Sequence, residues 1–207
     1  MPQVSITSSS PLCLGSASPR RKDLLNGLGL PIRVVVGDVD EEPVRGESPL
    51  DYLNRVVTDK LSAIACRAET FPECAALLVA DTIVRTEDRI IGKPRDVEGA
   101  LELLQLLSGR EHIVHTRYAI ASRCDFYRPL ASRTVTSKVY LRKSPVEILR
   151  RYASTGEGLD KAGAYAVQGI GAFLVERIEG SYSNVVGLPV CEVVSDLLGN
   201  ELLRDFP

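Results

Sequence analysis

The sequence predicts a domain of the α/β or α+β class. Short apolar and β-branched runs, which are typical of strands, alternate along the chain with segments whose apolar residues recur at helical spacing. Several helical segments begin with serine-proline or aspartate, residue types that favour helix starts. No low-complexity segment interrupts this order, so we expect one compact unit of mixed strands and helices.

In the first half of the chain, each segment carries a local signal for its structure. Ser18 can cap a helix in which Pro19 takes the first position, and Ser48-Pro49 opens a second helix. In that second helix, Lys60 falls within an apolar stripe. In chain order, the predicted elements are a strand at 12–17, a helix from 18, a strand at 33–36, an acidic turn at 37–43, a helix from 48 and a buried strand at 77–84.

The second half continues the alternation. Asp96 caps a helix that ends near Gly109, and Ser144 to Glu147 has the spacing of a capping box, with Pro145 at the first helical position. The predicted elements are that helix from 97, strands at 112–121 and 133–141 joined by a polar turn, a helix from 144 to about 152, a loop at 155–163, a strand pair at 164–168 and 171–178, and a final helix from Pro189 to Gly199.

Composition indicates a soluble, cytoplasmic protein. Of 207 residues, 25% are charged and 44% hydrophobic, and no segment approaches the roughly 20 apolar residues of a membrane helix. The N-terminus lacks the pattern of a secretory signal, and we expect residues 1–11 to be a flexible lead-in to a single domain at 12–207. Five scattered cysteines favour a reducing compartment, and a net charge of -2 argues against a nucleic-acid partner.

The segment from Gly15 to Arg21 has the features of a phosphate-binding loop. Small residues allow backbone N–H groups to approach a ligand, and the helix that follows directs its positive end to the same place. Ser16, Arg20 and Arg21 could contact phosphate oxygens, the two arginines as bidentate donors. The alternative is a capped helix with solvated arginines.

Four further charged residues are candidates for the same chemistry. Asp81 interrupts an apolar strand, where its carboxylate needs a partner: metal ligation or proton abstraction from water would explain it, and a structural ion pair is the alternative. Lys60 and Lys93 could bind phosphates, although Lys60 could equally extend its amine to solvent. Glu41 could be a second metal ligand or a solvated loop charge.

Other nucleotide-enzyme signatures are missing from the sequence. Neither a Walker A motif nor a G-x-G-x-x-G fingerprint occurs, which disfavours phosphate-loop NTPases and dinucleotide enzymes. His112 and His115 lie three residues apart in a predicted strand and therefore on opposite faces. We expect no catalytic role for them.

Taken together, the motifs resemble the Maf family of nucleotide pyrophosphatases, also known as septum formation inhibitor proteins. The resemblance runs in order from about residue 12 to the last helix. Its motifs are LGSASPRRKDLL at 14–25, the Asp40-Glu41 pair, ADTIV at 80–84, GKPRD at 92–96, LSGREHIVHT at 107–116, GEGLDKAGAYAVQG at 156–169 and YSNVVGLP at 182–189. It implies an α/β fold of the Maf and inosine-triphosphatase type, with an elongated mixed sheet flanked by helices and two lobes around a nucleotide cleft.

The resemblance also implies an activity. Members of the family cleave nucleoside triphosphates between the α and β phosphates, with Mg²⁺, Mn²⁺ or Co²⁺. Carried over to this sequence, the site comprises Ser16, Arg20, Arg21, Glu41, Lys60, Asp81 and Lys93. Asp81 would be general base or metal anchor, Glu41 a metal ligand, and the cations would bind phosphate. A homodimer would also fit the family.

Three positions bear on the substrate. The dTTP and UTP branch of the family has arginine, threonine and glutamine where this chain has Arg20, Thr82 and Gln168. The 7-methyl-GTP branch typically has tryptophan, glutamine and glutamate there, and this chain has no tryptophan. We therefore expect Thr82 and Gln168 to read a pyrimidine base. The alternatives are a 7-methyl-GTP pyrophosphatase and a non-catalytic nucleotide-binding regulator of cell division.

Overall fold

The computed structural model of the protein describes residues 4–87, 89–204 and 206, and this part of the chain has an α/β fold. Within it, seven strands form one mixed sheet in the order β2-β1-β3-β5-β6-β7, with β4 paired to β3. The strands are β1 (Leu12–Gly15), β2 (Ile32–Val34), β3 (Ala76–Arg85), β4 (Ile90–Ile91), β5 (Glu111–Ser122), β6 (Asp125–Leu141) and β7 (Val175–Glu179). The predicted α/β class with a mixed sheet is confirmed.

The helices follow the strands along the chain in the order that the sequence predicts, with one short addition. They are α1 (Pro19–Gly27), α2 (Pro49–Ala65), α3 (Val97–Leu107), α4 (Val146–Ala153), α5 (Tyr182–Val186) and α6 (Val190–Gly199). In the described residues, three short 3₁₀ helices occur at Ala68–Thr70, Ala162–Ala164 and Gly169–Leu174. The addition is α5, five residues long, which shows no periodic pattern in the sequence.

The described chain divides into two compact units. The first comprises residues up to 81 together with 116–134 and the segment from 187, and the second comprises 82–115 and 135–186. Strands β3, β5 and β6 contribute residues to both units. The predicted single domain at 12–207 and its nucleotide cleft stay predictions.

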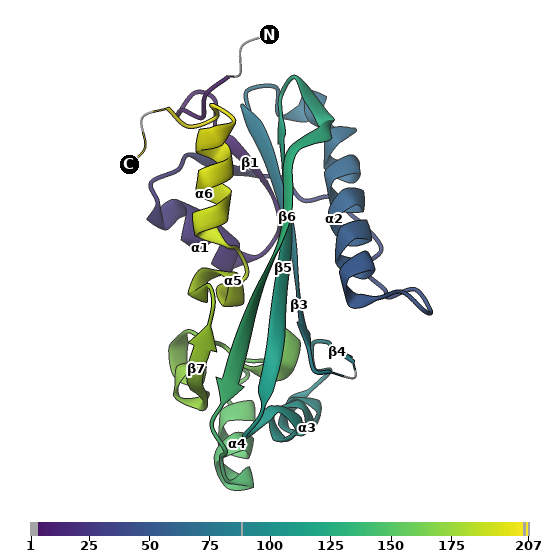
Figure 1. Ribbon diagram of the computed structural model, residues 1–207, viewed down its shortest axis with the longest axis vertical. Helices are drawn as coiled ribbons and strands as arrows, with labels where there is room; N and C mark the ends of the chain where they lie inside the picture. The colour runs from purple at the N-terminus through teal and green to yellow at the C-terminus, as the bar shows by residue number, and fades with distance from the viewer. Residues whose placement is uncertain (1–3, 88, 205, 207) are drawn as a thin grey trace. The chain divides into compact units, whose positions relative to one another are not determined.

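In the first unit, helices cover both faces of a parallel sheet. Strand β1 pairs in parallel with β2 on one side and β3 on the other. Figure 1 shows α2 on one face of these strands and α1 and α6 on the other. Because both faces are covered, β1 is buried along its whole length and consists of apolar or small residues.

Helix α2 contributes much of the first unit's core and also carries the lysine of the candidate site. The Ser48 side chain accepts a hydrogen bond from the backbone N–H of Asp51, and Pro49 takes the first turn, as the sequence predicts. Val57, Leu61 and Ile64 are buried against β1 and β3 in one hydrophobic cluster. Lys60 shares the face of this stripe and is half-buried.

The second unit has its own core, formed by α3, α4 and the strands beside them. Asp96 caps α3 by accepting a hydrogen bond from the Gly99 N–H at 2.8 Å, as predicted. Leu104 and Leu107 of α3 pack in one cluster with Leu149 and Tyr152 of α4. Strand β7 pairs antiparallel with the end of β6, at residues 138–141.

Three local predictions are wrong. The polar turn between β5 and β6 is much shorter than expected, because β6 begins at Asp125 and runs through Pro129. Strand β7 pairs with β6 only at residues 138–141, so in the described part of the chain the first half of β6 is a sheet edge. Proline, which cannot donate a hydrogen bond to the ladder, is tolerated at such an edge.

The predicted strand pair at 164–168 and 171–178 is the second error. Gly163, Ala164 and Gly169 have φ values of 79°, 60° and 68°, and residues Gly169–Leu174 form a 3₁₀ helix. These left-handed residues interrupt extended backbone, so β7 alone forms and pairs with β6. The third error is the capping box at 144–147: Pro145 precedes the first helical residue, and no side chain caps α4.

The first and last described residues lie in the first unit. Residues 1–3 of the predicted lead-in are outside the described residues; in the remainder, Ile6 is buried and its N–H donates to the Leu202 carbonyl oxygen at 2.8 Å. Thr7 and Ser10 form an isolated bridge. Among the helices of the described residues, none has the length and apolar character needed to span a membrane.

Candidate active site

The loop from Ser16 to Ser18 connects β1 to α1 and is the predicted phosphate-binding loop. Gly15 ends β1, and a Cβ atom there would lie 2.5 Å from Ile64 Cδ1 and 2.6 Å from Val79 Cγ1, so only glycine lets β1 pack this closely. Ser18 stands at the N-cap of α1, but its side chain makes no capping hydrogen bond. Instead, its backbone N–H donates to the Ser16 hydroxyl at 3.2 Å. The loop is therefore organised around Ser16.

Arg21 fixes this loop from inside the protein. Its Nη1 donates to the Ser16 hydroxyl at 2.9 Å and its Nε to the Gly187 carbonyl oxygen at 2.8 Å. The side chain is buried, which lowers its pKa, while the charges of Asp81 and Glu41 act in the opposite direction. Arg21 thus joins the loop to the segment before α6. It also lies close enough to Asp81 and Glu41, the two predicted metal ligands, to interact with their charges.

Lys60 brings together the two carboxylates predicted to hold a metal. Its Nζ lies 2.7 Å from Asp81 Oδ1 and 2.7 Å from Glu41 Oε1, so these two oxygens are no farther apart than twice that distance. The Lys60 and Asp81 side chains are 12% and 14% exposed, whereas Glu41 is 51% exposed. Helix α2, strand β3 and the acidic loop therefore meet at one charged cluster.

Two residues of α2 hold the acidic loop in place, and the sequence reasoning missed both. The Tyr52 hydroxyl donates to the Glu41 carbonyl oxygen at 2.9 Å. Burial and the nearby Asp81 and Glu41 charges raise the pKa of Tyr52 to about 12. Arg55 donates to the carbonyl oxygens of Asp40 and Glu42, at 3.3 and 2.9 Å. The sequence offers one indication of their role: Tyr52 and Arg55 lie about one to two helical turns before Lys60 in α2.

The Arg55 guanidinium also binds a carboxylate at the far end of the loop. Its Nε and Nη2 donate to the two carboxylate oxygens of Glu47, at 2.8 and 3.0 Å. These two hydrogen bonds lower the pKa of Glu47 and raise that of Arg55. Arg55 of α2 thus forms hydrogen bonds both to the backbone on either side of Glu41 and to Glu47 at the end of the loop.

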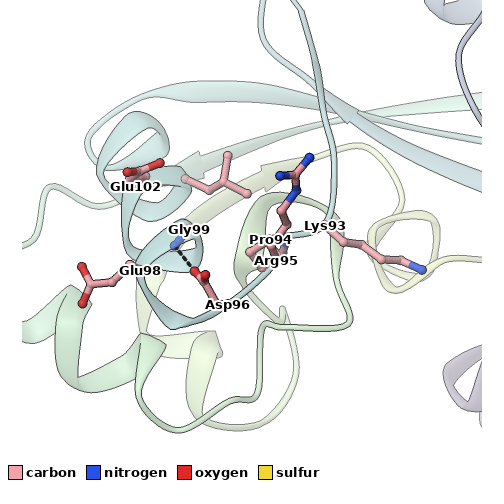
Figure 2. Close-up of a pocket in the computed structure, with 8 residues that line it drawn as sticks. Lys93, Pro94, Arg95, Asp96, Glu98, Gly99 and Glu102 are labelled. Carbon is pink, nitrogen blue, oxygen red and sulfur yellow. Dashed lines mark hydrogen bonds between the residues drawn. The ribbon is translucent and has the colours of Figure 1, made fainter.

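The remaining predicted residues belong to the second unit. Thr82 directly follows Asp81 in β3 and is half-buried, while Gln168 is exposed and precedes the 3₁₀ helix at Gly169–Leu174. Lys93 lies in the loop before α3 and is exposed. It is one of the residues that line a hollow of about 420 Å³ beside the start of α3. Figure 2 shows the Lys93 side chain extending away from α3. In the first unit, the structure brings together Ser16, Arg21, Glu41, Lys60 and Asp81, with half-buried Arg20 next to Arg21.

The two histidines have structural partners. His112 Nε2 lies 2.8 Å from the Tyr165 hydroxyl, and burial lowers the pKa of His112 to about 4. His115 accepts a hydrogen bond from Arg85 through Nε2 and lies 2.8 Å from the Thr136 hydroxyl through Nδ1. Burial and the Arg85 charge lower the pKa of His115 as well. Both ring nitrogens of His115 therefore have partners within the second unit, whereas His112 has one through Nε2 and its buried Nδ1 has none among the described residues.

The predicted phosphate-binding loop, a buried arginine and a lysine held between two carboxylates thus occupy one α/β unit. A family model described as Maf-like protein matches residues 11–200. The chain belongs to this family, as the motifs predict.

Relatives at 40–45% identity carry a specific name, dTTP/UTP pyrophosphatase. That of Geobacter metallireducens (strain ATCC 53774 / DSM 7210 / GS-15) is 45% identical over 188 residues, which cover 91% of this chain and 95% of the relative. That of Desulfotalea psychrophila (strain LSv54 / DSM 12343) is 44% identical over 188 residues, covering 91% and 93%. That of Nitratidesulfovibrio vulgaris is 40% identical over 196 residues, covering 93% and 89%.

Proposed function

We propose that this chain is a nucleoside triphosphate pyrophosphatase that hydrolyses dTTP and UTP to the monophosphate and pyrophosphate. Its similarity to relatives with that name, over nearly the full length of both chains, supports the substrate. The observation that carries the chemistry is the cluster in which Lys60 contacts both Asp81 and Glu41. Such a cluster places acid-base and phosphate-binding groups side by side.

In the proposed reaction, Asp81 accepts a proton from a water molecule. The water oxygen forms a bond to the α-phosphorus, the bond from that phosphorus to the bridging oxygen breaks, and pyrophosphate leaves with the electron pair. Asp81 is suited to this role because its side chain is mostly buried but still 14% exposed, so a water molecule can reach it. Its partner Lys60 carries three N–H donors on a flexible stem, so the ammonium can turn from Asp81 to a phosphate oxygen.

The cationic residues have a second task in the proposal. Arg20, Lys60 and Lys93 would offset the negative charge that develops on phosphate oxygens, an effect commonly worth about 3 kcal/mol for a well-placed group. Arg21, with its hydrogen bonds to Ser16 and Gly187, would hold the loop in shape for Ser16 and Arg20. Thr82 and Gln168 would read the pyrimidine base.

The carboxylates also suit a divalent cation. Asp81 and Glu41 already hold a cation, the Lys60 ammonium, between their oxygens, and carboxylate oxygens are the ligands that Mg²⁺ and Mn²⁺ prefer. Among the described residues, no group of three or more acidic, histidine or cysteine side chains could hold a metal. We therefore propose that Glu41 and Asp81 bind the ion together with substrate oxygens. The ion would polarise the phosphates.

The test is direct. The purified chain is incubated with Mn²⁺ and dTTP, UTP or 7-methyl-GTP, and monophosphate, pyrophosphate and orthophosphate are measured. We expect monophosphate and pyrophosphate in equal amounts, faster from dTTP and UTP, and no turnover after EDTA treatment. Faster cleavage of 7-methyl-GTP would refute the pyrimidine preference, and orthophosphate as first product would refute the bond assignment. Nucleotide binding without any turnover would favour a regulatory protein.

A further inference from the structure

Glu157 is tied to a segment that it precedes by more than ten residues. Its Oε1 accepts a hydrogen bond from the Ile170 N–H at 2.9 Å, and its Oε2 accepts one from the Gly171 N–H at 2.7 Å. Burial raises the pKa of Glu157, but the two N–H donors, the Tyr152 hydroxyl and the Lys161 charge together lower it by more, which favours the carboxylate anion. One half-buried carboxylate therefore fixes two consecutive backbone groups of the 3₁₀ helix at Gly169–Leu174.

Tyr152 of α4 extends this network to the other side of the same segment. Its hydroxyl donates to Glu157 Oε2 at 2.9 Å and accepts from the Ala166 N–H at 3.0 Å. Its ring also packs edge-on against Phe173, with 6.0 Å between ring centroids. The side chain is 2% exposed. Tyr152 thus connects α4 to Ala166 before residue 168 and to Phe173 after it.

The glycines of the segment leave room for these two side chains. Gly169 has a φ of +68°, and a Cβ atom there would lie 2.2 Å from Glu157 Oε1. A Cβ atom at Gly171 would lie 2.4 Å from the Tyr152 hydroxyl. The sequence Gln168-Gly169-Ile170-Gly171 is therefore shaped around the Glu157 carboxylate and the Tyr152 hydroxyl.

Gln168 lies between the two anchored stretches. The Ala166 N–H is bonded two residues before it, and the Ile170 and Gly171 N–H groups are bonded two and three residues after it. Gln168 itself is exposed. An exposed amide on a backbone fixed at both sides is pre-organised to bind a ligand, because little conformational freedom remains to be lost.

We propose that Glu157 is a positioning residue that sets the preference for pyrimidine nucleotides by holding the backbone that presents Gln168. This inference rests on the proposed function and on the predicted role of Gln168 in reading the base. Glu157 itself touches no substrate in the proposal. Tyr152 acts with it, because its hydroxyl bonds the Ala166 N–H on one side of Gln168 and the Glu157 carboxylate that holds the other side.

The experiment compares kcat/KM for dTTP and for 7-methyl-GTP in Glu157→Gln, with Tyr152→Phe as a second variant that removes the hydroxyl and keeps the ring. Glutamine replaces one of the two carboxylate oxygens by an NH₂ group, which donates and does not accept, so one of the two backbone N–H groups loses its separate acceptor. The control is Glu176→Gln, an identical replacement at an exposed position of β7. We expect both test variants to lower the dTTP to 7-methyl-GTP ratio about tenfold or more, and the control to leave it unchanged.

A double-mutant cycle separates positioning from general stability. If Glu157 acts through Gln168, Glu157→Gln added to Gln168→Ala should change the ratio little further. An equal loss of kcat/KM for both nucleotides, or the same change of ratio with and without Gln168, would overturn the inference. In either case the wild-type chain would still release pyrophosphate from dTTP, whereas a failure of the proposed function would appear as no such release by the wild type.

Discussion

Replacing Asp81, the proposed proton acceptor, is the simplest test of the proposed reaction. Replacement by asparagine keeps the size of the side chain and removes the group that would accept a proton. Because Lys60 keeps Glu41 as a partner at 2.7 Å, we expect the fold to persist. Release of pyrophosphate from dTTP should fall by about 100-fold or more.

Asp59→Asn provides the comparison for this variant. Asp59 lies on α2 one residue before Lys60, and its side chain is 49% exposed and weakly paired with Arg55. The same replacement there should leave turnover close to wild type, since exposed pairs contribute little. Near-normal turnover in Asp81→Asn, with melting temperatures of both variants unchanged, would remove Asp81 from the mechanism.

Gly15 makes a separate prediction about stability. In Gly15→Ala, the new methyl group would lie 2.5 Å from Ile64 Cδ1 and 2.6 Å from Val79 Cγ1, so these buried side chains, or the elements that carry them, must shift. We expect a loss of about 1–3 kcal/mol in the free energy of unfolding, measured by urea denaturation. Gly27→Ala is the matched control, because nothing lies within 4 Å of a Cβ atom at Gly27 and its φ is not positive. Equal stability of the two variants would contradict the close packing of β1.

Single residues also show how far the sequence leads to the site. Lys60 and Asp81 are candidates from sequence because a charge in an apolar stripe or strand requires a partner. Ser16 is a candidate because it lies in a loop of small residues before a helix, and Glu41 because it is a carboxylate in an acidic turn. The sequence could not reveal which charges pair, since Lys60 and Asp81 lie 21 residues apart in the chain. The burial of Arg21 was also hidden: its acceptor on Gly187 is 166 residues away.

At the scale of elements, α2 holds the acidic loop in a fixed position through Arg55. Arg55 binds the loop through two carbonyl oxygens and the Glu47 carboxylate, and so limits the positions that Glu41 can take. In Arg55→Met these contacts are lost, while the stem length is nearly kept. We expect the Mn²⁺ concentration for half-maximal turnover to rise about tenfold, since ordering of the loop must then accompany metal binding.

Arg45→Met tests whether loss of positive charge alone explains such an effect. Arg45 is exposed in the same loop. The metal requirement of this variant should stay within about twofold of wild type. If the two replacements raise the metal requirement equally, electrostatics rather than loop restraint is responsible, and the role assigned to Arg55 is wrong.

Elements with a strong local signal were predictable, and those shaped by distant partners were not. The caps of α2 and α3 are encoded by Ser48 and Asp96, which bond to N–H groups three residues away. In contrast, the course of residues 164–174 depends on Glu157 and Tyr152, whose hydrogen bonds to this segment no local pattern announces. The predicted strand pair at 164–168 and 171–178 is therefore wrong, because side chains distant in sequence set the course of the backbone.

At the scale of the whole molecule, the predicted substrate-binding residues come from both compact units. Ser16, Arg20 and Arg21 belong to the first unit, and Thr82, Lys93 and Gln168 to the second. The sequence places all of them in family motifs but contains no information on distances between units. The family resemblance predicts that one nucleotide uses residues of both sets, and binding measurements on one variant from each set test this.

This leads to a prediction for α,β-methylene dTTP, an analogue that resists cleavage of the bond in question. With Mn²⁺ and the analogue at about 100 times its Kd, the wild-type chain should gain about 2.7 kcal/mol, which corresponds to a rise in Tm of roughly 5–10 °C for a chain of this size. Arg20→Ala and Gln168→Ala should each weaken binding about tenfold and so remove about 1.4 kcal/mol of that gain at the same concentration.

The control, Gln105→Ala, removes an exposed amide of α3 in the second unit and should keep the full rise in Tm. Each variant is compared with its own Tm without analogue, so that a change in intrinsic stability does not enter the result. If Arg20→Ala abolishes the response and Gln168→Ala behaves like the control, the nucleotide is bound by the first unit alone. Base recognition by Gln168, and with it the positioning role of Glu157, would then be wrong, while the phosphate chemistry of Asp81 and Lys60 would stand.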